Sequence, residues 1–486
     1  MSRSVELYLG PPGTGKTTTL LKIVQDSGLE PEDIAYVGFT RKAAYEAQGR
    51  AIAAGIADSP EELPFFRTLH STAFRQLRLT RQQLMLTKNF TELGHFLGLD
   101  FKFDYDEGME RAPIGGGLGD RALRIYSIAR SRMCSLEEAY RYVGDEDVDF
   151  GLVTDFCHKL EIYKRRNKLY DFTDILDAAQ KPLPVGLFIL DEAQDLTRQQ
   201  WALARRLARS ARRVVFAGDD DQAIFQWAGA DVDYFLRLEA ARTVLPKSYR
   251  LPKSVWQFAN RIVTRISARY TKQWEPRDEE GEVRHIQSLE EVDLRKDTWL
   301  LLTRHQSHVR TLERLCREQG VVYQVGGKWS NMAPSVRAAV SYEQLRRGEV
   351  LRKEEVANIL AYVVGEHRFF QREYRFNDLF HRDVSWMEAL TKLSDEDREY
   401  LRALRANGES LRAPGRVVIS TIHGSKGGEA DHVLLLSDCH RKVMEGFDLD
   451  PDPELRVWYV AATRARKTLL IHTNKEMNNL LYFFTN

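Results

Sequence analysis

Short apolar runs that end in polar, glycine-containing turns recur along the chain. In the first half they read VELYLG, IAYVGF, GLFILDE and RVVFAGD, and in the second half TWLLLTR, VVISTIH, HVLLLSD and TLLIHT. Segments with the apolar period of an α-helix separate most of these runs. Buried strands that alternate with helices are typical of βαβ units and parallel sheets. The pattern therefore predicts two α/β domains, one early and one late in the chain.

Two stretches interrupt this alternation, because they are mostly helical and charged in pattern and hold few strand candidates. We interpret each stretch as a mostly helical insertion within one α/β domain. The predicted bounds are 1–80 plus 171–250 for the first domain, 81–170 for its insertion, 251–330 plus 413–486 for the second domain, and 331–412 for its insertion.

Composition narrows the class of protein. The length of 486 residues exceeds one ordinary core and suggests roughly two to four domains. With 43% hydrophobic residues, 29% charged residues and a net charge of +1, the chain is typical of a globular protein, and a polyanionic partner is neither suggested nor excluded. No apolar run approaches the about 18 residues of a transmembrane helix, and no signal-peptide pattern is present. Four cysteines without metal-ligand spacing suggest a reducing compartment, so we expect a cytoplasmic protein without membrane contact.

The sequence GPPGTGKT matches the phosphate-loop pattern G-x-x-x-x-G-K-[ST]. It follows a predicted strand and precedes a predicted helix, where backbone N–H groups and the helix N-terminus bind phosphate oxygens. Lys16 would reach the β- and γ-phosphates, and Thr17 would ligate Mg²⁺. The alternative is a glycine-rich turn with a chance lysine. The predicted nucleotide-binding residues are Gly10, Pro11, Pro12, Gly13, Thr14, Gly15, Lys16, Thr17 and Thr18.

The segment LFILDEAQD supplies a pair of carboxylates at the end of another buried strand. Because the carboxyl ends of parallel strands meet at one edge of a sheet, Asp191 and Glu192 are expected beside the phosphates. Asp191 would hold the hydrated Mg²⁺, and Glu192 would orient or deprotonate the attacking water. The alternative is that these acids only cap the following helix. Next to a phosphate loop, the pair favours hydrolysis of the bound nucleotide.

The segment GDDDQAIFQWAG closes a further strand of the same predicted sheet. Its first residues should therefore lie near the γ-phosphate, which Gln222 could sense. Phe225 and Trp227 stand further along the loop, and aromatic faces stack on nucleobases without regard to sequence. Core packing is the alternative for these two rings.

These three segments, together with six others, resemble the UvrD/Rep family of superfamily 1 helicases in the family's order. The resemblance covers both α/β halves and implies two RecA-like P-loop motor domains, each with a helical insertion. The further segments are FTRKAA at 39–44, TLHSTAFRQL at 68–77, YDFTDIL at 170–176, SYRLP at 248–252, TIHGSKGGEAD at 421–431 and YVAATRAR at 459–466.

The resemblance implies that ATP is bound with Mg²⁺ between the two motor domains. Tyr249 would stack on adenine and Arg250 would reach the γ-phosphate. Glu429 would bind the ribose hydroxyls, and Arg464 would act as an arginine finger that stabilises the transferring phosphoryl group. The family also carries a glutamine segment upstream of the phosphate loop that reads adenine. Only nine residues precede Gly10 here, so the preference for adenine stays open.

The resemblance also implies a single-stranded DNA site in which aromatic rings stack on successive bases and polar groups hold phosphates. Stacking is worth ~1–3 kcal/mol per base and tolerates any sequence, which suits a motor on arbitrary DNA. One loop would then couple the γ-phosphate, through Gln222, to the grip on bases. The predicted DNA-binding residues are Phe39, Thr40, His70, Phe225, Trp227 and His423.

Three functional hypotheses follow. The first is an ATP-dependent translocase on single-stranded DNA that unwinds duplexes in the 3′-to-5′ direction, from single-strand/double-strand junctions. The second is a DNA-stimulated ATPase that remodels or loads protein–DNA complexes without processive unwinding. The second insertion is shorter than the regulatory subdomain of the family, which favours this hypothesis. The third is a nucleotide switch unrelated to nucleic acid. For the first we expect a bacterial or phage motor that can act as a monomer, with replication or repair proteins as candidate partners.

Overall fold

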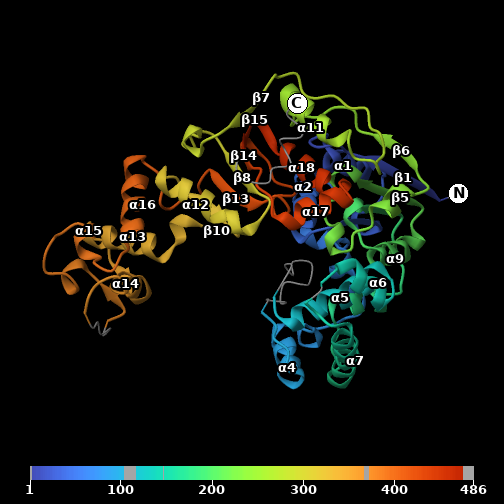
Figure 1. The fold of residues 1–486 in the computed structure, drawn as a ribbon, viewed down its shortest axis with the longest axis horizontal. Helices are drawn as coiled ribbons and strands as arrows, with labels where there is room; N and C mark the ends of the chain where they lie inside the picture. Colours follow the sequence, from blue (N-terminus) through green and yellow to red (C-terminus); the bar gives the residue numbers. More distant parts are fainter. Residues whose placement is uncertain (1–2, 103–115, 146, 366–370, 474–486) are drawn as a thin grey trace. The chain divides into compact units, whose positions relative to one another are not determined.

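The computed structural model describes residues 3–102, 116–145, 147–365 and 371–473 (Figure 1). The chain divides into two compact units, each built around one sheet. The first unit comprises Met1–Arg250 and Ile266–Arg277, and the second comprises Leu251–Arg265 and Asp278–Asn486.

The sheet of the first unit has six strands in the order β3-β2-β4-β5-β1-β6, and all neighbouring pairs are parallel. Strands β2 and β4 are buried along their whole length, which explains their continuous apolar sequences. In the register of β1 and β5, Leu9 lies opposite Gly218, so the two loops that follow start side by side. The strands are β1 Ser4–Leu9, β2 Ile34–Gly38, β3 Phe66–Thr68, β4 Leu187–Leu190, β5 Arg213–Gly218 and β6 Ala241–Val244.

A separate hydrophobic core lies on each face of this sheet. Successive residues of a strand point to opposite faces, and along β4 Leu187 and Ile189 join one core while Phe188 and Leu190 join the other. Helices α1 and α2 contribute to the first core, and α3, α8 and α9 to the second. The helices are α1 Lys16–Asp26, α2 Arg41–Ala53, α3 Leu69–Gln76, α8 Phe172–Ala178, α9 Arg198–Leu207 and α10 Val232–Leu236.

The stretch expected as the first insertion is helical in its described part and has a hydrophobic core of its own. Phe90 of α4, Ile125 of α5 and Phe156 of α7 are fully buried in that core. The helices are α4 Thr87–Leu97, α5 Leu118–Arg132, α6 Leu136–Val143 and α7 Phe150–Asn167 (Figure 1).

The sheet of the second unit has seven strands in the order β10-β9-β13-β8-β14-β15-β7. Only the β10–β9 pair is antiparallel, and all other pairs are parallel. The strands are β7 Glu282–Ile286, β8 Trp299–Thr303, β9 Tyr323–Val325, β10 Lys328–Trp329, β13 Val417–Thr421, β14 Ala430–Leu436 and β15 Ala465–His472. The helices that accompany them are α11 Lys253–Val263, α12 Val309–Glu318, α17 Arg441–Leu449 and α18 Asp452–Ala462.

The second insertion shares its core with the sheet from which it emerges. Leu301 and Ile419 of the sheet belong to the same buried cluster as Tyr342, Trp386 and Tyr400 of the insertion. This arrangement differs from that of the first insertion, whose core is separate. Its helices are α13 Pro334–Arg346, α14 Lys353–Leu360, α15 Trp386–Ala389 and α16 Asp395–Ala406 (Figure 1). Its two short strands, β11 Leu351–Arg352 and β12 Glu373–Tyr374, form an antiparallel pair.

The predicted fold class, two parallel-sheet α/β domains with helical insertions, is confirmed. One segment departs from the predicted division of the chain, since residues 251–330 were assigned to the second domain but Ile266–Arg277 pack with the first unit. Lys272 of this segment is fully buried against carboxylates of the first unit. The pairing joins charges distant in the sequence, which a reading of local patterns does not detect.

Two general features of the described residues bear on the class of protein. Among the helices in the described ranges, none is both long and apolar enough to cross a membrane. Cys134, Cys157 and Cys316 are free thiols. Burial raises the pKa of the Cys157 thiol to about 12 and also raises that of Cys316, so both remain protonated at neutral pH.

A buried lysine joins the first insertion to the body of its unit. Lys164 of α7 is 3% exposed, and its Nζ donates to Asp171 Oδ2 at 2.6 Å and to Asp174 Oδ2 at 2.7 Å. Asp171 is also the N-cap of α8, where its carboxylate accepts the N–H of Asp174. Burial alone would lower the pKa of Lys164, but the two carboxylates outweigh it and raise that pKa above its ordinary value.

Lys164→Met should lower the free energy of unfolding by about 3–5 kcal/mol, because it leaves the buried Asp171 without its counter-charge and Asp174 with Arg130 alone. Urea unfolding followed by circular dichroism measures this change. Lys159→Met on the same helix is the control, since Lys159 pairs with Asp155 at an exposed site and should cost less than about 1 kcal/mol. Equal losses for the two variants would contradict the anchoring role of Lys164.

Candidate nucleotide-binding site

The loop from Gly10 to Thr17 connects β1 to α1 in the conformation that a phosphate loop requires. Gly13 and Gly15 have φ values of 73° and 76°, in the left-handed region that side chains rarely adopt. A Cβ on Gly13 would also lie 2.3 Å from Cβ of Arg250, so this close approach needs glycine. The Thr14 hydroxyl donates to Pro11 O at 2.8 Å and closes the loop. The start of α1 therefore presents its backbone N–H groups at this edge of the sheet.

Lys16 contacts both acids predicted from the second motif. Its Nζ lies 2.5 Å from Glu192 Oε1 and 3.4 Å from Asp191 Oδ1. Burial would lower the pKa of Lys16, but the two carboxylates outweigh it and raise that pKa. The lysine is therefore charged and stands where the phosphates of a nucleotide would compete for it.

The two predicted Mg²⁺ ligands share a neighbour. Tyr36 of β2 donates its hydroxyl to Asp191 Oδ2 at 2.9 Å and also interacts with the Thr17 hydroxyl. Burial raises the pKa of Asp191, because it disfavours the charged carboxylate. The described residues contain no group of three or more His, Cys, Asp or Glu side chains that could hold a metal ion. One hydroxyl and one carboxylate fit a cation that takes its remaining ligands from phosphates and water, as Mg²⁺ does.

Gln194 is a site residue that sequence reasoning missed. Its side chain is fully buried, and its Nε2 donates to Glu192 Oε2 at 2.7 Å while its Oε1 accepts the N–H of Asp219 at 3.0 Å. Gly218 must be glycine here, because an added Cβ would lie 2.3 Å from Gln194 Oε1. Glu192 itself has a φ of 55°, an uncommon value for a residue with a side chain. The signal in the sequence was an amide between two acids after a buried strand.

The same hydrogen bonds reach Gln222. Its Nε2 donates to Asp219 Oδ2 at 2.7 Å, and Asp219 is bonded through its N–H to Gln194. A continuous series of hydrogen bonds, which includes the backbone N–H of Asp219, therefore runs from Lys16 through Glu192, Gln194 and Asp219 to Gln222. It joins the loops that follow β1, β4 and β5.

The SYR segment packs directly on the phosphate loop. Ser248 donates its hydroxyl to Pro12 O at 2.7 Å, and the N–H of Tyr249 donates to Gly13 O at 2.8 Å. The ring of Tyr249 is 72% exposed and lies 3.8 Å from the Cβ position of Gly15. The structure thus brings Tyr249, like Arg250, to the phosphate loop, and leaves a flat aromatic face open beside it.

The aromatic residues predicted for DNA binding gather at the same edge. Phe39, which follows β2, stacks with Phe225 at a centroid distance of 5.6 Å and an interplanar angle of 28°. Phe225 and Trp227 are half-buried, in the loop that begins with the three aspartates. The first insertion contacts this loop, because the Tyr142 hydroxyl donates to Gln226 O at 3.0 Å.

Two of the predicted phosphate contacts have structural roles as well. The Thr40 side chain is exposed and caps α2, accepting the N–H of Ala43 at 3.1 Å. His70 of α3 lies edge-on to Phe172 at 6.0 Å. Sequence reasoning did not anticipate the cap, although threonine before a helix is a common N-cap.

In the second unit, two of the three predicted residues lie together. Glu429 and Arg464 directly precede the paired strands β14 and β15, at their amino ends. The Arg464 side chain is 2% exposed and donates to Val460 O at 2.9 Å and to Gly428 O at 3.3 Å. His423 follows the carboxyl end of β13, at the opposite edge of the same parallel sheet.

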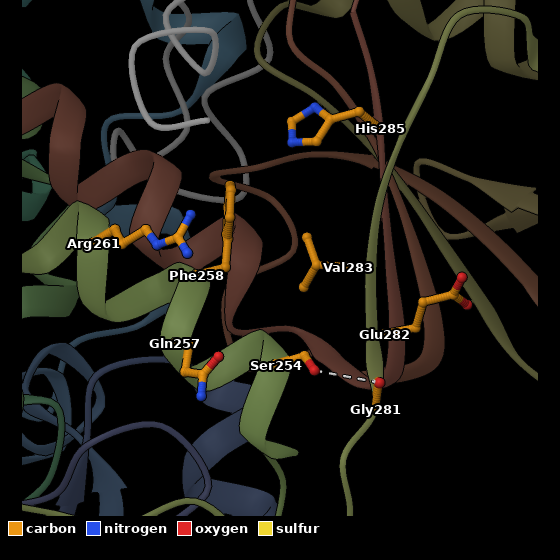
Figure 2. Close-up of a pocket in the computed structure, with 8 residues that line it drawn as sticks. All are labelled: Ser254, Gln257, Phe258, Arg261, Gly281, Glu282, Val283 and His285. Carbon is orange, nitrogen blue, oxygen red and sulfur yellow. Dashed lines mark hydrogen bonds between the residues drawn. The ribbon is translucent and has the colours of Figure 1, made fainter. Parts of the chain in front are cut away.

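A hollow of about 390 Å³ lies in the second unit between α11 and β7 (Figure 2). Ser254 at its rim donates to Gly281 O at 3.4 Å. None of the residues predicted from the sequence lines it. The lining residues are Ser254, Gln257, Phe258, Arg261, Gly281, Glu282, Val283 and His285.

Comparison with protein families finds two matching models. The model of the UvrD/REP helicase N-terminal domain matches residues 3–242, and that of the UvrD-like helicase C-terminal domain matches residues 386–476. Together they match more than half of the chain.

The chain is also similar to curated proteins named ATP-dependent DNA helicase PcrA. It is 24% identical over 389 residues to that of Leuconostoc citreum and over 393 residues to that of Bacillus subtilis, covering 74% of this chain and 50% of each relative. The chain thus spans about half the length of these relatives. Among solved structures, the arterivirus nonstructural protein 10 helicase matches 96% of this chain and 59% of its own, at 12% identity and a TM-score of 0.36.

Gln194→Leu should lower the free energy of unfolding by about 1–3 kcal/mol, because leucine keeps the volume but removes the hydrogen bonds to Glu192 and Asp219. Urea unfolding measures the change. Gln180→Leu is the control at an exposed position and should shift stability by less than about 0.5 kcal/mol. A Gln194→Leu protein as stable as the control would show that the buried amide does not bind these loops together.

Proposed function

Because the chain belongs to the UvrD/REP helicase family, we propose that it hydrolyses ATP to move along single-stranded DNA and unwinds duplexes in the 3′-to-5′ direction. The observation that carries this proposal is the series of hydrogen bonds from Lys16 to Gln222. The loop that contains Gln222 also contains Phe225 and Trp227. A change at the phosphates can therefore reach rings suited to hold bases.

At the phosphate loop, ATP would take over the partner of Lys16. The lysine is paired with Glu192 and Asp191, and the γ-phosphate would compete with Glu192 for its charge. Glu192, released from the lysine, would then be able to orient or deprotonate the attacking water. Gln194 holds the other oxygen of this carboxylate and keeps it in place. The exposed ring of Tyr249 would stack on the base, and Arg250 would contact the γ-phosphate.

Thr17 and Asp191 would hold Mg²⁺ by a hydroxyl and a carboxylate oxygen, the ligands that this cation prefers. When bound, Mg²⁺ neutralises charge on the β- and γ-phosphates. Tyr36 donates to the second oxygen of Asp191 and leaves the first toward Lys16. The proposed cofactor set is therefore ATP with Mg²⁺.

On the DNA side, Phe39, Phe225 and Trp227 would stack on successive bases, Thr40 and His70 would contact phosphates, and His423 would also contact the DNA. Stacking of ~1–3 kcal/mol per base does not discriminate among bases. Gln222 would sense the γ-phosphate and shift the loop only three residues before Phe225. Binding and release of one strand would thus follow each round of hydrolysis.

Glu429 and Arg464 are the proposed contacts to ribose and to the transferring phosphoryl group. Their support is that both directly precede paired strands of the second unit. Single-stranded DNA and its junctions with duplex are the proposed substrates. Action as a monomer in the cytoplasm of a bacterial or phage-infected cell, beside replication or repair proteins, belongs to the same proposal.

A DNA-stimulated ATPase that remodels or loads protein–DNA complexes is a second candidate. The observation that favours it is the second insertion, which shares one core with its sheet instead of forming a separate body. An insertion held in this way has less freedom to move against a duplex. Unwinding assays separate the two candidates.

We expect the protein to displace a strand from duplexes with a 3′ single-stranded tail, and not from those with a 5′ tail, when ATP and Mg²⁺ are present. Gel analysis of labelled duplexes measures this, with ATP turnover followed in parallel. Lys16→Ala is the control and should lower turnover by about 10²-fold or more, because it removes the cation that contacts the phosphates.

Displacement only from 5′ tails would contradict the proposed polarity. DNA-stimulated turnover without displacement would support the second candidate. ATP turnover that does not change when DNA is added would support the third hypothesis, a nucleotide switch. Normal ATP turnover by Lys16→Ala would contradict the assignment of the phosphate loop.

Trp227→Ala should weaken binding of single-stranded DNA by about 1–3 kcal/mol and reduce DNA stimulation more than basal ATP turnover. Fluorescence anisotropy with a labelled oligonucleotide measures the affinity. Trp227→Phe retains a stacking face and should keep most of it. If Trp227→Ala instead lowers basal turnover and thermal stability together, the ring serves core packing.

A further inference from the structure

A twelve-residue segment, Ile266–Arg277, here called the strap, leaves the second unit and packs on the first before the chain returns. It follows α11 and precedes β7, both of which belong to the second unit. Along the strap, Lys272 and Trp274 are buried while Thr271 and Gln273 are exposed. This alternation is that of an extended chain with one face against the protein.

Two cationic side chains on the buried face of the strap pair with three consecutive aspartates. Lys272 Nζ lies 2.5 Å from Asp220 Oδ1, 2.8 Å from Asp221 Oδ2 and 3.0 Å from Asp219 Oδ1, and its side chain has no exposed area. Arg269 donates from Nε and Nη2 to the two oxygens of Asp221, both at 2.8 Å. The three aspartates are almost completely buried as well.

Three adjacent buried carboxylates cannot stay charged without such partners. Burial raises the pKa of Asp220. For Asp221 burial acts in the same direction, but Lys272 and Arg269 outweigh it and lower that pKa. The strap thus supplies the charges that hold the loop after β5 in one conformation.

The other end of the strap holds the SYR segment. The backbone carbonyl of Glu275 accepts the N–H of Ser248 at 2.8 Å, and the N–H of Glu275 donates to Pro246 O at 2.8 Å. Ser248 in turn donates to Pro12 O of the phosphate loop. The strap therefore contacts both the loop after β5 and the SYR segment, which are far apart in the sequence but both adjoin the phosphate site.

We infer that Lys272 is a positioning residue for ATP hydrolysis, which acts through Asp219 on Gln222, and that Arg269 supports it by holding the adjacent Asp221. This inference rests on the proposed ATPase function and adds to it two residues outside all the segments on which the family resemblance rests. Asp219 accepts from both Lys272 and Gln222, so loss of the lysine would release the carboxylate that orients the glutamine amide. The strap is covalently continuous with the second unit at both of its ends.

A double-mutant cycle tests the inference. Lys272→Met should lower the rate of ATP turnover by about 10²-fold, the effect of a displaced reactive group, with little change in ATP affinity. Gln222→Ala should have a similar effect, and the double variant should be no slower than Gln222→Ala alone, because both act through one amide. Lys181→Met is the matched control, as Lys181 is exposed and precedes the amino end of β4.

The inference is overturned if Lys272→Met turns over ATP at the wild-type rate, or if the two effects multiply in the double variant. The wild-type protein and Lys16→Ala, assayed alongside, test the proposed function separately, because that function fails if the wild-type protein does not hydrolyse ATP or if Lys16→Ala hydrolyses it at the wild-type rate. If Lys272→Met unfolds below the assay temperature, Arg269→Gln at the edge of the cluster replaces it. Its slower turnover should also be absorbed by Gln222→Ala, and multiplication of the effects would again overturn the inference.

Discussion

The first unit depends on the pairing of buried carboxylates with cations at the carboxyl edge of its sheet. Five acids follow two neighbouring strands there, and each would be costly to bury alone. Lys16 pairs with the acids after β4, and Lys272 and Arg269 pair with those after β5. The acids are Asp191, Glu192, Asp219, Asp220 and Asp221. Without these cations, the loops that carry the predicted chemistry would not hold their shape.

Lys16 and Lys272 differ in whether their carboxylate partners can be exchanged. Lys16 is 12% exposed and stands at the open phosphate loop, so an incoming phosphate can draw it away from Glu192. Lys272 is fully buried among its three carboxylate partners, so an incoming phosphate cannot reach it. Gln194 joins the two groups, since it contacts Glu192 on one side and Asp219 on the other. The amide of Gln194 thus connects the ion pair of Lys16, which a phosphate can exchange, to the buried ion pairs of Lys272, which it cannot.

The second unit separates its predicted functions between the two edges of one sheet. Glu429 and Arg464 lie at the amino ends of β14 and β15, and His423 lies at the carboxyl end of β13. Nucleotide contacts and DNA contacts would therefore be made on opposite sides of the same rigid layer. In the first unit, by contrast, Lys16 and Gln222 follow strands at one edge and are connected by hydrogen bonds, and Phe225 lies three residues beyond Gln222. The proposed coupling of ATP to base binding accordingly resides in the first unit.

The amino-acid sequence alone predicted the fold class and the phosphate loop, because strand periodicity and the glycines around Lys16 are patterns of residues close together in the chain. It also indicated that Gln222 and Trp227 share a loop. The tertiary structure decided the rest: that Gln194 carries hydrogen bonds between loops, and that Lys272 belongs to the first unit. The reason is that the partner of a buried charge is set by proximity in space, and the sequence between Asp221 and Lys272 contains no periodic signal of that pairing.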